Sequence, residues 1–247
     1  MKTVHFVRHG ETEQNKDGIW QGHTNTQLSK TGKAQAKLLS KRINLKNQTV
    51  FTSDLARAKE TAYFLSDSPN VRENLREINV GDFTGKSVKE TYSNNLEIFD
   101  ALQYDTYVFP NGESVQEFKL RVQKEVDHIF DNIDEDSECV VVTHGFFIGT
   151  AIGLVLGFNQ YPYPIGNIQN TSISTVIKRD SVMQVNKFND AIHLPNSYID
   201  YPTKDKSRIL TFIRHGQTDS NTQGVWQGHV DNPLNTYGVE TAKQLKG

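Results

Sequence analysis

Two mainly apolar segments of this chain each run directly into a histidine followed by a glycine. Val4-His5-Phe6-Val7 precedes Arg8-His9-Gly10, and Val140-Val141-Val142-Thr143 precedes His144-Gly145. Short, continuous apolar segments of this kind are typical of strands buried on both faces of a sheet. In open α/β sheets, ligands bind just beyond the carboxyl ends of the strands. The sequence therefore predicts a ligand site that contains His9 and His144.

Strand and helix patterns alternate along most of the chain. This alternation predicts an α/β fold, a three-layer sandwich with a mostly parallel central sheet and helices on both faces. Ser29 is the predicted N-cap of the first long helix. The predicted strands lie at 4–7, 49–52, near 71, 140–143, 173–178 and 182–188, and the predicted helices at 28–42, 55–65, 88–92, 96–102, 115–133 and 145–156.

Composition excludes several classes of protein. With 36% hydrophobic and 23% charged residues and a net charge of −2, the chain has the balance of a globular enzyme and no basic field for nucleic acid or an anionic membrane. Its one cysteine, Cys139, rules out a disulfide framework and lies in an apolar run that predicts a core position. No signal peptide or membrane span is recognisable, so we expect a cytoplasmic protein.

The end of the chain repeats its beginning. Phe212-Ile213-Arg214-His215-Gly216-Gln217-Thr218 matches the first motif at an offset of 206, and Trp226-Gln227-Gly228-His229 matches Trp20-Gln21-Gly22-His23. We therefore expect one domain over residues 1–194, a linker over 195–206, and the truncated start of a second copy over 207–247. This tail is too small to bury a core alone. We expect it to be inactive, and either poorly ordered, packed on a sheet edge or exchanged with another molecule.

The residue types at the predicted site favour a phosphate group. Arg8 places a guanidinium beside the His9 imidazole, which is a competent nucleophile. Arg57 falls in the first turn of a predicted helix, where free N–H groups also attract anions. Structural hydrogen bonding by the histidines is one alternative. A metal site built from His9, His23 and His144 is another, which the neighbouring arginines disfavour because they repel cations.

Several separated motifs together resemble the histidine phosphatase superfamily, which includes cofactor-dependent phosphoglycerate mutase and its phosphatase relatives. The resemblance covers residues 1 to about 194 and ends at Asn189-Asp190-x-x-His193-Leu194. It rests on Arg8-His9-Gly10-Glu11-Thr12, Asn15, Gln21-Gly22, Leu28-Ser29-x-x-Gly32-x-x-Gln35-Ala36, Thr52-Ser53-Asp54-Leu55-x-Arg57-Ala58, Leu75-x-Glu77-x-x-x-Gly81, Gly112-Glu113-Ser114 and Thr143-His144-Gly145.

The resemblance implies a role for each matching residue. His9 would be the nucleophile that becomes phosphohistidine, and Glu77 would protonate the leaving oxygen and then activate water. The phosphoryl group would be surrounded by Arg8, Arg57 and His144, helped by Asn15. Neither a metal nor a cofactor would be needed. The further candidates for substrate contacts are Thr12, Gln21 and Gly22.

Two physical expectations follow from these roles. The guanidiniums should lower the pKa of His9 and keep it neutral, with its second nitrogen bonded to an acceptor such as a backbone carbonyl. Glu77 should be partly desolvated, so that its carboxyl group can carry a proton. Asn25 departs from the family pattern, which has Asp there; the tail keeps Asp231.

Hydrolysis of a small phosphate ester is the leading hypothesis for the function. Only 67 positions separate Glu77 from His144, which resembles the compact phosphatase branch, whereas mutases carry a longer insertion. Gln21 also stands where mutases usually carry Thr. A phosphoglycerate mutase and a phosphate-binding module without turnover are the alternatives, and the natural substrate is left open.

Overall fold

The computed structural model describes residues 1–43, 48–94, 106–158, 167–195 and 213–244. The chain divides into two compact units, Met1–Ile199 and Asp200–Gly247. The first contains both predicted strand ends.

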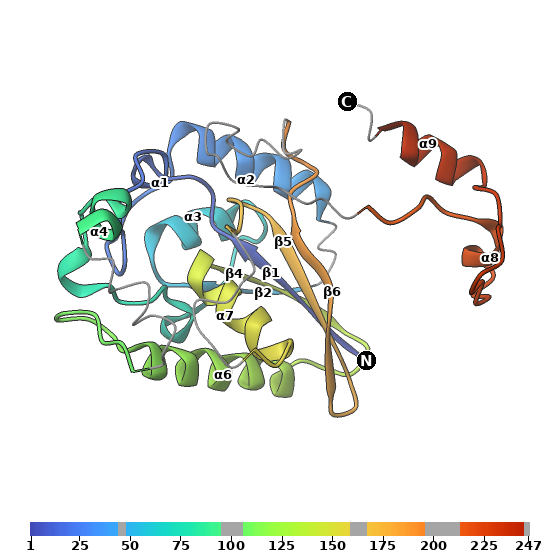
Figure 1. Ribbon diagram of the computed structural model, residues 1–247. Helices are drawn as coiled ribbons and strands as arrows, with labels where there is room; N and C mark the ends of the chain where they lie inside the picture. Colours follow the sequence, from blue (N-terminus) through green and yellow to red (C-terminus); the bar gives the residue numbers. More distant parts are fainter. Residues whose placement is uncertain (44–47, 95–105, 159–166, 196–212, 245–247) are drawn as a thin grey trace. The chain divides into compact units, whose positions relative to one another are not determined.

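A six-stranded sheet forms the centre of the first unit (Figure 1). Its strand order is β3-β2-β4-β1-β5-β6, and the pairs from β3 to β1 are parallel, whereas β5 and β6 pair in the antiparallel direction. The prediction of an α/β fold with a mostly parallel sheet is confirmed. The strands are β1 (Lys2–Arg8), β2 (Thr49–Ser53), β3 (Asn70–Arg72), β4 (Glu138–Thr143), β5 (Ile173–Arg179) and β6 (Val182–Asp190).

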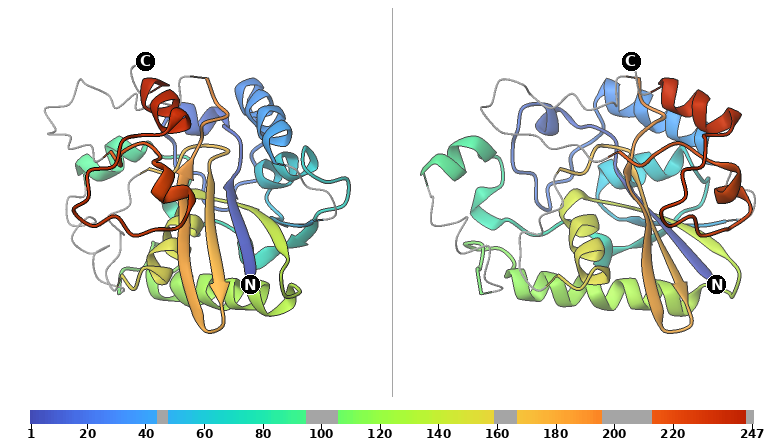
Figure 2. Two further views of the ribbon diagram at one scale, coloured as in Figure 1. Left: turned by 90° about the vertical axis from the view of Figure 1, so that its right-hand side faces the viewer. Right: turned by 45° about the vertical axis from the view of Figure 1, so that its right-hand side comes forward.

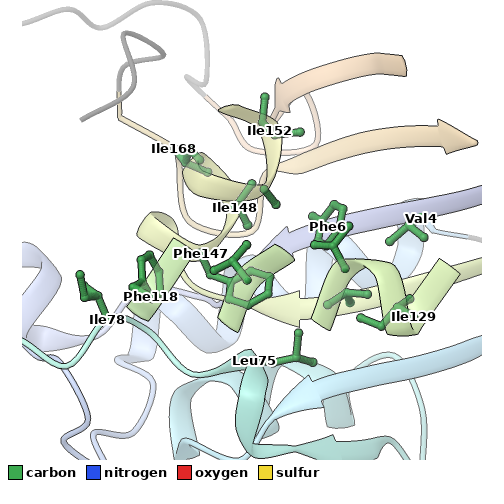
Figure 3. Close-up of a cluster of buried hydrophobic side chains, with 14 of the residues drawn as sticks. Val4, Phe6, Leu75, Ile78, Phe118, Ile129, Phe147, Ile148, Ile152 and Ile168 are labelled. Atoms are coloured by element: carbon green, nitrogen blue, oxygen red, sulfur yellow. The ribbon is translucent and has the colours of Figure 1, made fainter. Parts of the chain in front are cut away.

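Helices cover both faces of the sheet. Figure 2 shows α2 and α6 on opposite sides of it, with the β5–β6 hairpin in orange beside the blue first strand. Each face has its own apolar cluster, and the larger one, packed around α6 and α7, is drawn in Figure 3. The principal helices are α2 (Lys30–Arg42), α3 (Ala56–Tyr63), α6 (Val115–Asn132) and α7 (Gly145–Val155), and the shorter ones are α1 (Glu13–Lys16) and α4 (Val88–Asn94).

Burial on both faces explains why the centre of β4, residues 139–142, is apolar. Cys139 and Val141 belong to the larger cluster, and Val140 and Val142 belong to the smaller one on the other face. Successive side chains of a strand point to opposite faces, so a strand covered on both sides has no polar face. Burial raises the pKa of the Cys139 thiol to about 12, which keeps it protonated in the core.

The register of the sheet brings the functional strand ends to one edge. Arg8 lies opposite Thr143, and Thr52 lies opposite Val142, so β1, β2 and β4 end side by side. The segment after β1 is pressed against the start of α2, where a Cβ at Gly10 would lie 2.6 Å from the Gly32 carbonyl oxygen. Because no side chain fits there, the close approach fixes the path of the chain after His9.

The segment from residue 75 to 85 lies between the predicted strand near 71 and the predicted helix at 88–92. It contains the end of one short 3₁₀ helix, Glu73–Leu75, and all of another, Gly81–Phe83. Glycines at 81 and 85 lie within this segment, and Gly81, the first residue of the second 3₁₀ helix, has a φ of +50°. The predicted helix at 96–102 lies outside the described residues, whereas the one at 88–92 is α4.

The second unit forms short helices, one of which has the same N-terminal contacts as a helix of the first unit. Thr218 and Asn221 form the same capping box at α8 (Asp219–Thr222) that Thr12 and Asn15 form at α1, and α9 (Thr236–Gln244) corresponds to α2. Over residues 213–244 no strand is formed. Trp226 is 99% exposed, whereas its counterpart Trp20 is 8% exposed within a core. The limits of the tail and its lack of activity stay predictions.

None of the helices in the described ranges is both long enough and apolar enough to span a bilayer.

Candidate active site

His9 follows β1 directly and is 2% exposed. Its backbone N–H donates to the Thr143 carbonyl oxygen at 2.9 Å. Its side-chain Nδ1 lies 2.7 Å from the Gly10 carbonyl oxygen, and a carbonyl can only accept. Nδ1 therefore carries the proton, as expected, and Nε2 keeps the free lone pair that a nucleophile needs.

His144 lies beside His9, with the two ring centroids 5.2 Å apart. Its Nε2 is 2.9 Å from the hydroxyl oxygen of Ser53, and that oxygen accepts from the Leu55 N–H at 3.3 Å. Ser53 is fully buried, and its hydroxyl proton has one neighbouring acceptor among the described residues, His144 Nε2. This contact assigns the proton of His144 to Nδ1, a buried atom with no other partner in the described part of the chain.

Two guanidiniums accompany the histidines. Arg57, which is 1% exposed in the first turn of α3, donates to the carbonyl oxygens of Thr24 at 2.7 Å and Gly22 at 2.8 Å. Arg8 donates to the Ile168 carbonyl oxygen and lies against Gly145, where α7 begins. In both arginines Nε is buried and makes no hydrogen bond within the described residues. Each therefore keeps a donor that a bound phosphate oxygen would satisfy.

Glu77 brings a carboxyl group to the start of α7. Its two oxygens accept from the backbone N–H groups of Ile78 at 3.1 Å and Phe146 at 3.2 Å. Burial raises the pKa of Glu77 above its ordinary 4.5, although these two N–H groups, Arg57 and Arg8 act in the opposite direction. The expectation of a desolvated carboxyl that can hold a proton is confirmed.

Asn15 and its neighbours form hydrogen bonds that hold the loop after β1 in place. The Asn15 side-chain oxygen accepts from the Thr12 N–H at 3.2 Å and from the Asn170 amide at 3.3 Å, and Asn170 also donates to the His9 carbonyl oxygen at 2.9 Å. The Thr12 hydroxyl donates to the Gln21 side-chain oxygen at 3.1 Å. No contact among the described residues engages the amide nitrogen of Asn15, and its hydrogen bond to a phosphate oxygen stays a prediction.

Gly22 and Asn25 support Arg57 from the same loop. Gly22 has a φ of +48° and offers its carbonyl oxygen to Arg57, and a Cβ there would lie 2.9 Å from a Val80 methyl group. Asn25, the departure from the family pattern, accepts from the Ala56 N–H at 2.8 Å at the start of α3. Its amide oxygen thus serves as a cap at the helix that carries Arg57. Direct substrate contacts of Thr12, Gln21 and Gly22 stay predictions.

A metal centre does not fit these contacts. The described residues contain no group of three histidine, cysteine or acidic side chains placed to hold a metal. His23, the third histidine of that alternative, donates from Nε2 to the Glu77 carbonyl oxygen at 2.7 Å. It therefore supports the backbone of Glu77.

Sequence reasoning assigned no role to three residues that hold the site together. Ser53 lies in a motif quoted for the family, but its partner His144 is 91 positions away. Asn170 is 161 positions from His9 and belongs to none of the motifs. Thr61, whose hydroxyl accepts from the Gly10 N–H at 2.9 Å, lies one helical turn after Arg57, and that spacing was the one available signal.

The two histidines of the site have lowered pKa values. Burial, followed by Arg57, holds the pKa of both His9 and His144 well below 6.5, and Arg8 lowers both further. The structure confirms the expected effect of the guanidiniums and adds burial as the larger cause. Both imidazoles are therefore neutral at neutral pH.

We expect the folded protein to lose stability as the pH falls below about 6.5. The unfolded chain binds protons at His9 and His144 near pH 6.5, whereas the folded chain does not, so the free energy of unfolding falls by up to about 1.4 kcal/mol per pH unit for each histidine. The raised pKa of Glu77 opposes this trend, but only as one group against two. Urea unfolding between pH 5 and 7.5 measures the slope. A His144→Ala variant should show a smaller slope, and equal slopes would contradict the assignment.

Comparison with known proteins places this arrangement in a family. A profile described as histidine phosphatase superfamily (branch 1) matches residues 4–191 and 210–247. The chain is 30% identical over 199 residues to a metal-independent phosphoserine phosphatase of Arabidopsis thaliana, covering 76% of this chain and 82% of the relative. It is 28% identical over 185 residues to a probable phosphoglycerate mutase, GpmB, of Photorhabdus laumondii, covering 71% and 85%.

A solved structure agrees with the fold. A mutant phosphoserine phosphatase from Entamoeba histolytica, in complex with phosphoserine, matches with a TM-score of 0.71 and 28% identity over 79% of this chain and all of that one. The resemblance drawn from the separated motifs is thereby confirmed. The chain belongs to the histidine phosphatase superfamily (branch 1).

Proposed function

We propose that the protein hydrolyses small phosphomonoesters through a phosphohistidine at His9. The observation that carries this proposal is the 2.7 Å contact from His9 Nδ1 to the Gly10 carbonyl oxygen, which leaves Nε2 as a free lone pair. A neutral imidazole held in one tautomer is ready to attack phosphorus without losing a proton first. The relatives named as phosphatases support hydrolysis over the mutase alternative.

The cations of the site are suited to the charge of the transferring group. Phosphoryl transfer passes through a loose transition state with charge spread over the equatorial oxygens, so fixed cations supply most of the catalysis. Arg8 and Arg57 each keep a buried Nε donor, and the proton of His144 is assigned to Nδ1. These donors cost no reorganisation during the reaction, because protein contacts already hold their side chains.

The proposed reaction has two steps. In the first, His9 Nε2 bonds to phosphorus as the ester P–O bond breaks, and Glu77 gives its proton to the leaving oxygen. In the second, Glu77 takes a proton from water, the water oxygen bonds to phosphorus, and the P–N bond breaks to release phosphate. Glu77 is suited to both steps because its pKa is raised toward neutral pH. Asn15 adds a hydrogen bond to a phosphate oxygen through its amide nitrogen.

Rapid-quench labelling tests the covalent step and separates the three candidate functions. With a labelled phosphate ester, we expect acid-labile label on the chain and a burst of released alcohol before steady turnover. The panel should contain phosphoserine and phosphoglycerates, since the relatives carry those names. Isomerisation of phosphoglycerate faster than hydrolysis of every ester would favour a mutase. Bound but unreacted ester would favour a binding module.

We expect the activity to persist without divalent metal. Metal-dependent phosphatases obtain positive charge from bound metal ions. Here the guanidiniums of Arg57 and Arg8, held by backbone carbonyl groups, supply that charge without an added ion. Hydrolysis rates should agree within about twofold before and after dialysis against EDTA. A loss of activity restored by Mg²⁺ or Mn²⁺ would contradict this expectation.

A further inference from the structure

One side chain from another part of the fold makes three contacts with the backbone around Glu77. Arg121, on α6, donates from Nη1 to the carbonyl oxygens of Asn74 at 2.8 Å and Arg76 at 2.9 Å, and from Nη2 to that of Glu77 at 3.2 Å. We call residues 74–79 the Glu77 segment. Three contacts from one planar guanidinium fix both the position and the orientation of this segment.

Glu113 occupies the remaining donors of the same guanidinium. Its carboxylate accepts from Arg121 Nε at 2.9 Å and from Nη2 at 2.8 Å. With these two bonds, all five N–H groups of Arg121 have protein partners. Arg121 therefore has no donor left for a substrate, and its contacts serve to position other groups.

Glu113 also contacts the Glu77 segment directly. Its carboxylate accepts from the Asn79 N–H at 3.2 Å, and its own N–H donates to the Asn79 carbonyl oxygen at 2.8 Å. Gly112 allows this approach, since a Cβ there would lie 2.4 Å from the Asn79 carbonyl oxygen. The family motif Gly112-Glu113-Ser114 had no role assigned from the sequence. Through Gly112 and Glu113, it contacts the segment that carries the Glu77 carboxyl group.

We propose that Arg121 and Glu113 form a positioning pair that holds the Glu77 carboxyl group at the leaving oxygen. This inference rests on the proposed function, because it assumes that Glu77 is the proton donor. Arg121 acts through Glu77 and touches neither the substrate nor the reacting atoms. A small displacement of a proton donor costs rate even where the fold is unchanged.

The leaving group of the substrate distinguishes positioning from a general structural role. An alkyl phosphate expels a strongly basic alkoxide, which needs a proton, whereas a dinitrophenyl phosphate expels a stable phenolate, which does not. A misplaced Glu77 slows the transfer of the phosphoryl group to His9 from the first ester and spares the transfer from the second. Hydrolysis of the phosphohistidine, in which Glu77 takes a proton from water, is common to both esters, so the comparison is made in kcat/KM, which that later step does not affect. A protein that is merely less stable, or that binds phosphate less well, loses activity toward both.

The experiment compares Arg121→Met and Arg121→Lys with the unaltered full chain on glycerol phosphate and 2,4-dinitrophenyl phosphate. We expect kcat/KM, which reports the phosphorylation of His9, to fall about 10- to 100-fold on glycerol phosphate and to change less than about threefold on the dinitrophenyl ester. Glu77→Gln should show the same pattern with a larger effect. In the double variant of Glu77→Gln with Arg121→Met, the second change should add little, because both act on one group.

Arg42→Met is the matched control. Arg42 pairs with Asp190, and the two side chains are 23% and 24% exposed, comparable with 20% and 15% for Arg121 and Glu113. In the part of the chain that the structure describes, Arg42 bonds to Asp190 and His193 and to no residue of the Glu77 segment. Its loss should leave the ratio of the two rates unchanged.

Equal losses on both substrates in folded Arg121 variants would overturn the proposal, and so would unchanged rates. If Arg121→Met fails to fold, Arg121→Lys and Glu113→Gln decide the question by the same ratio. The proposed function is judged separately, because it fails if Glu77→Gln shows no dependence on the leaving group, and the positioning role then fails with it. If only the Arg121 and Glu113 variants lack the dependence, the positioning role alone is wrong.

Discussion

Replacing His9 with alanine should abolish turnover, with a loss of about 10³-fold or more in kcat on every phosphate ester. No other described residue is placed to replace the nucleophile, since His144 has its Nε2 engaged with Ser53 and its proton assigned to Nδ1. The same variant should take up no acid-labile label in a rapid-quench experiment. We expect it to fold, at a cost of less than about 3 kcal/mol in the free energy of unfolding, because the backbone bond from residue 9 to Thr143 persists.

The repeat supplies a matched control for this variant. His215 has the same 2.7 Å contact from Nδ1 to the carbonyl oxygen of the next glycine, but it lies in the exposed part of the second unit. His215→Ala should therefore retain full activity and full labelling. Activity that survives in His9→Ala, or is lost in His215→Ala, would show that the wrong copy of the motif had been chosen.

The two histidines could be paired from sequence because strand ends are a local property. Val4–Val7 and Val140–Thr143 are mainly apolar, which predicts burial on both faces, and parallel strands end at a common edge. The structure places Arg8 opposite Thr143, so His9 and His144 follow from neighbouring positions. Arg57 was found for a related reason, since a strand that passes directly into a helix leaves its first turn at that edge.

Glu77 shows where local reasoning ends. Nothing in its neighbourhood distinguishes it from Glu73 or Glu90, and only the family resemblance singled it out. Burial raises its pKa, whereas an N–H group of Phe146, 69 positions away, bonds its carboxylate and lowers the pKa. Arg121 is a similar case, because its five contacts converge only after α6 packs beside the Glu77 segment. Helical periodicity predicts that α6 exists but not which carbonyl groups its arginine meets.

The buried positive charges of Arg8 and Arg57, which we call the cage, lower the stability of the folded protein. A bound anion should offset this loss. Arg57 is 1% exposed, and burial lowers its pKa to about 10, so that it is still charged at neutral pH. Arg8 repels it and Glu77 attracts it. An anion that binds only the folded state stabilises that state by about 2.7 kcal/mol at one hundred times its Kd. Inorganic phosphate or vanadate should therefore raise the melting temperature of the unaltered protein.

Arg57→Met should remove both the catalytic help and this stabilisation. We expect kcat to fall about 10²- to 10³-fold, because one of two fixed cations is lost from the transferring phosphoryl group. Arg57→Lys should lose at least about tenfold, since an ammonium cannot hold the Gly22 and Thr24 carbonyl oxygens and also present a flat donor edge to phosphate. Thermal unfolding with and without phosphate measures the binding, and Arg42→Met, which removes one positive charge elsewhere, should keep the full shift. If phosphate raises the melting temperature of Arg57→Met by as much as it raises that of the unaltered protein, then phosphate binds outside the cage, and Arg57 does not contact the phosphoryl group.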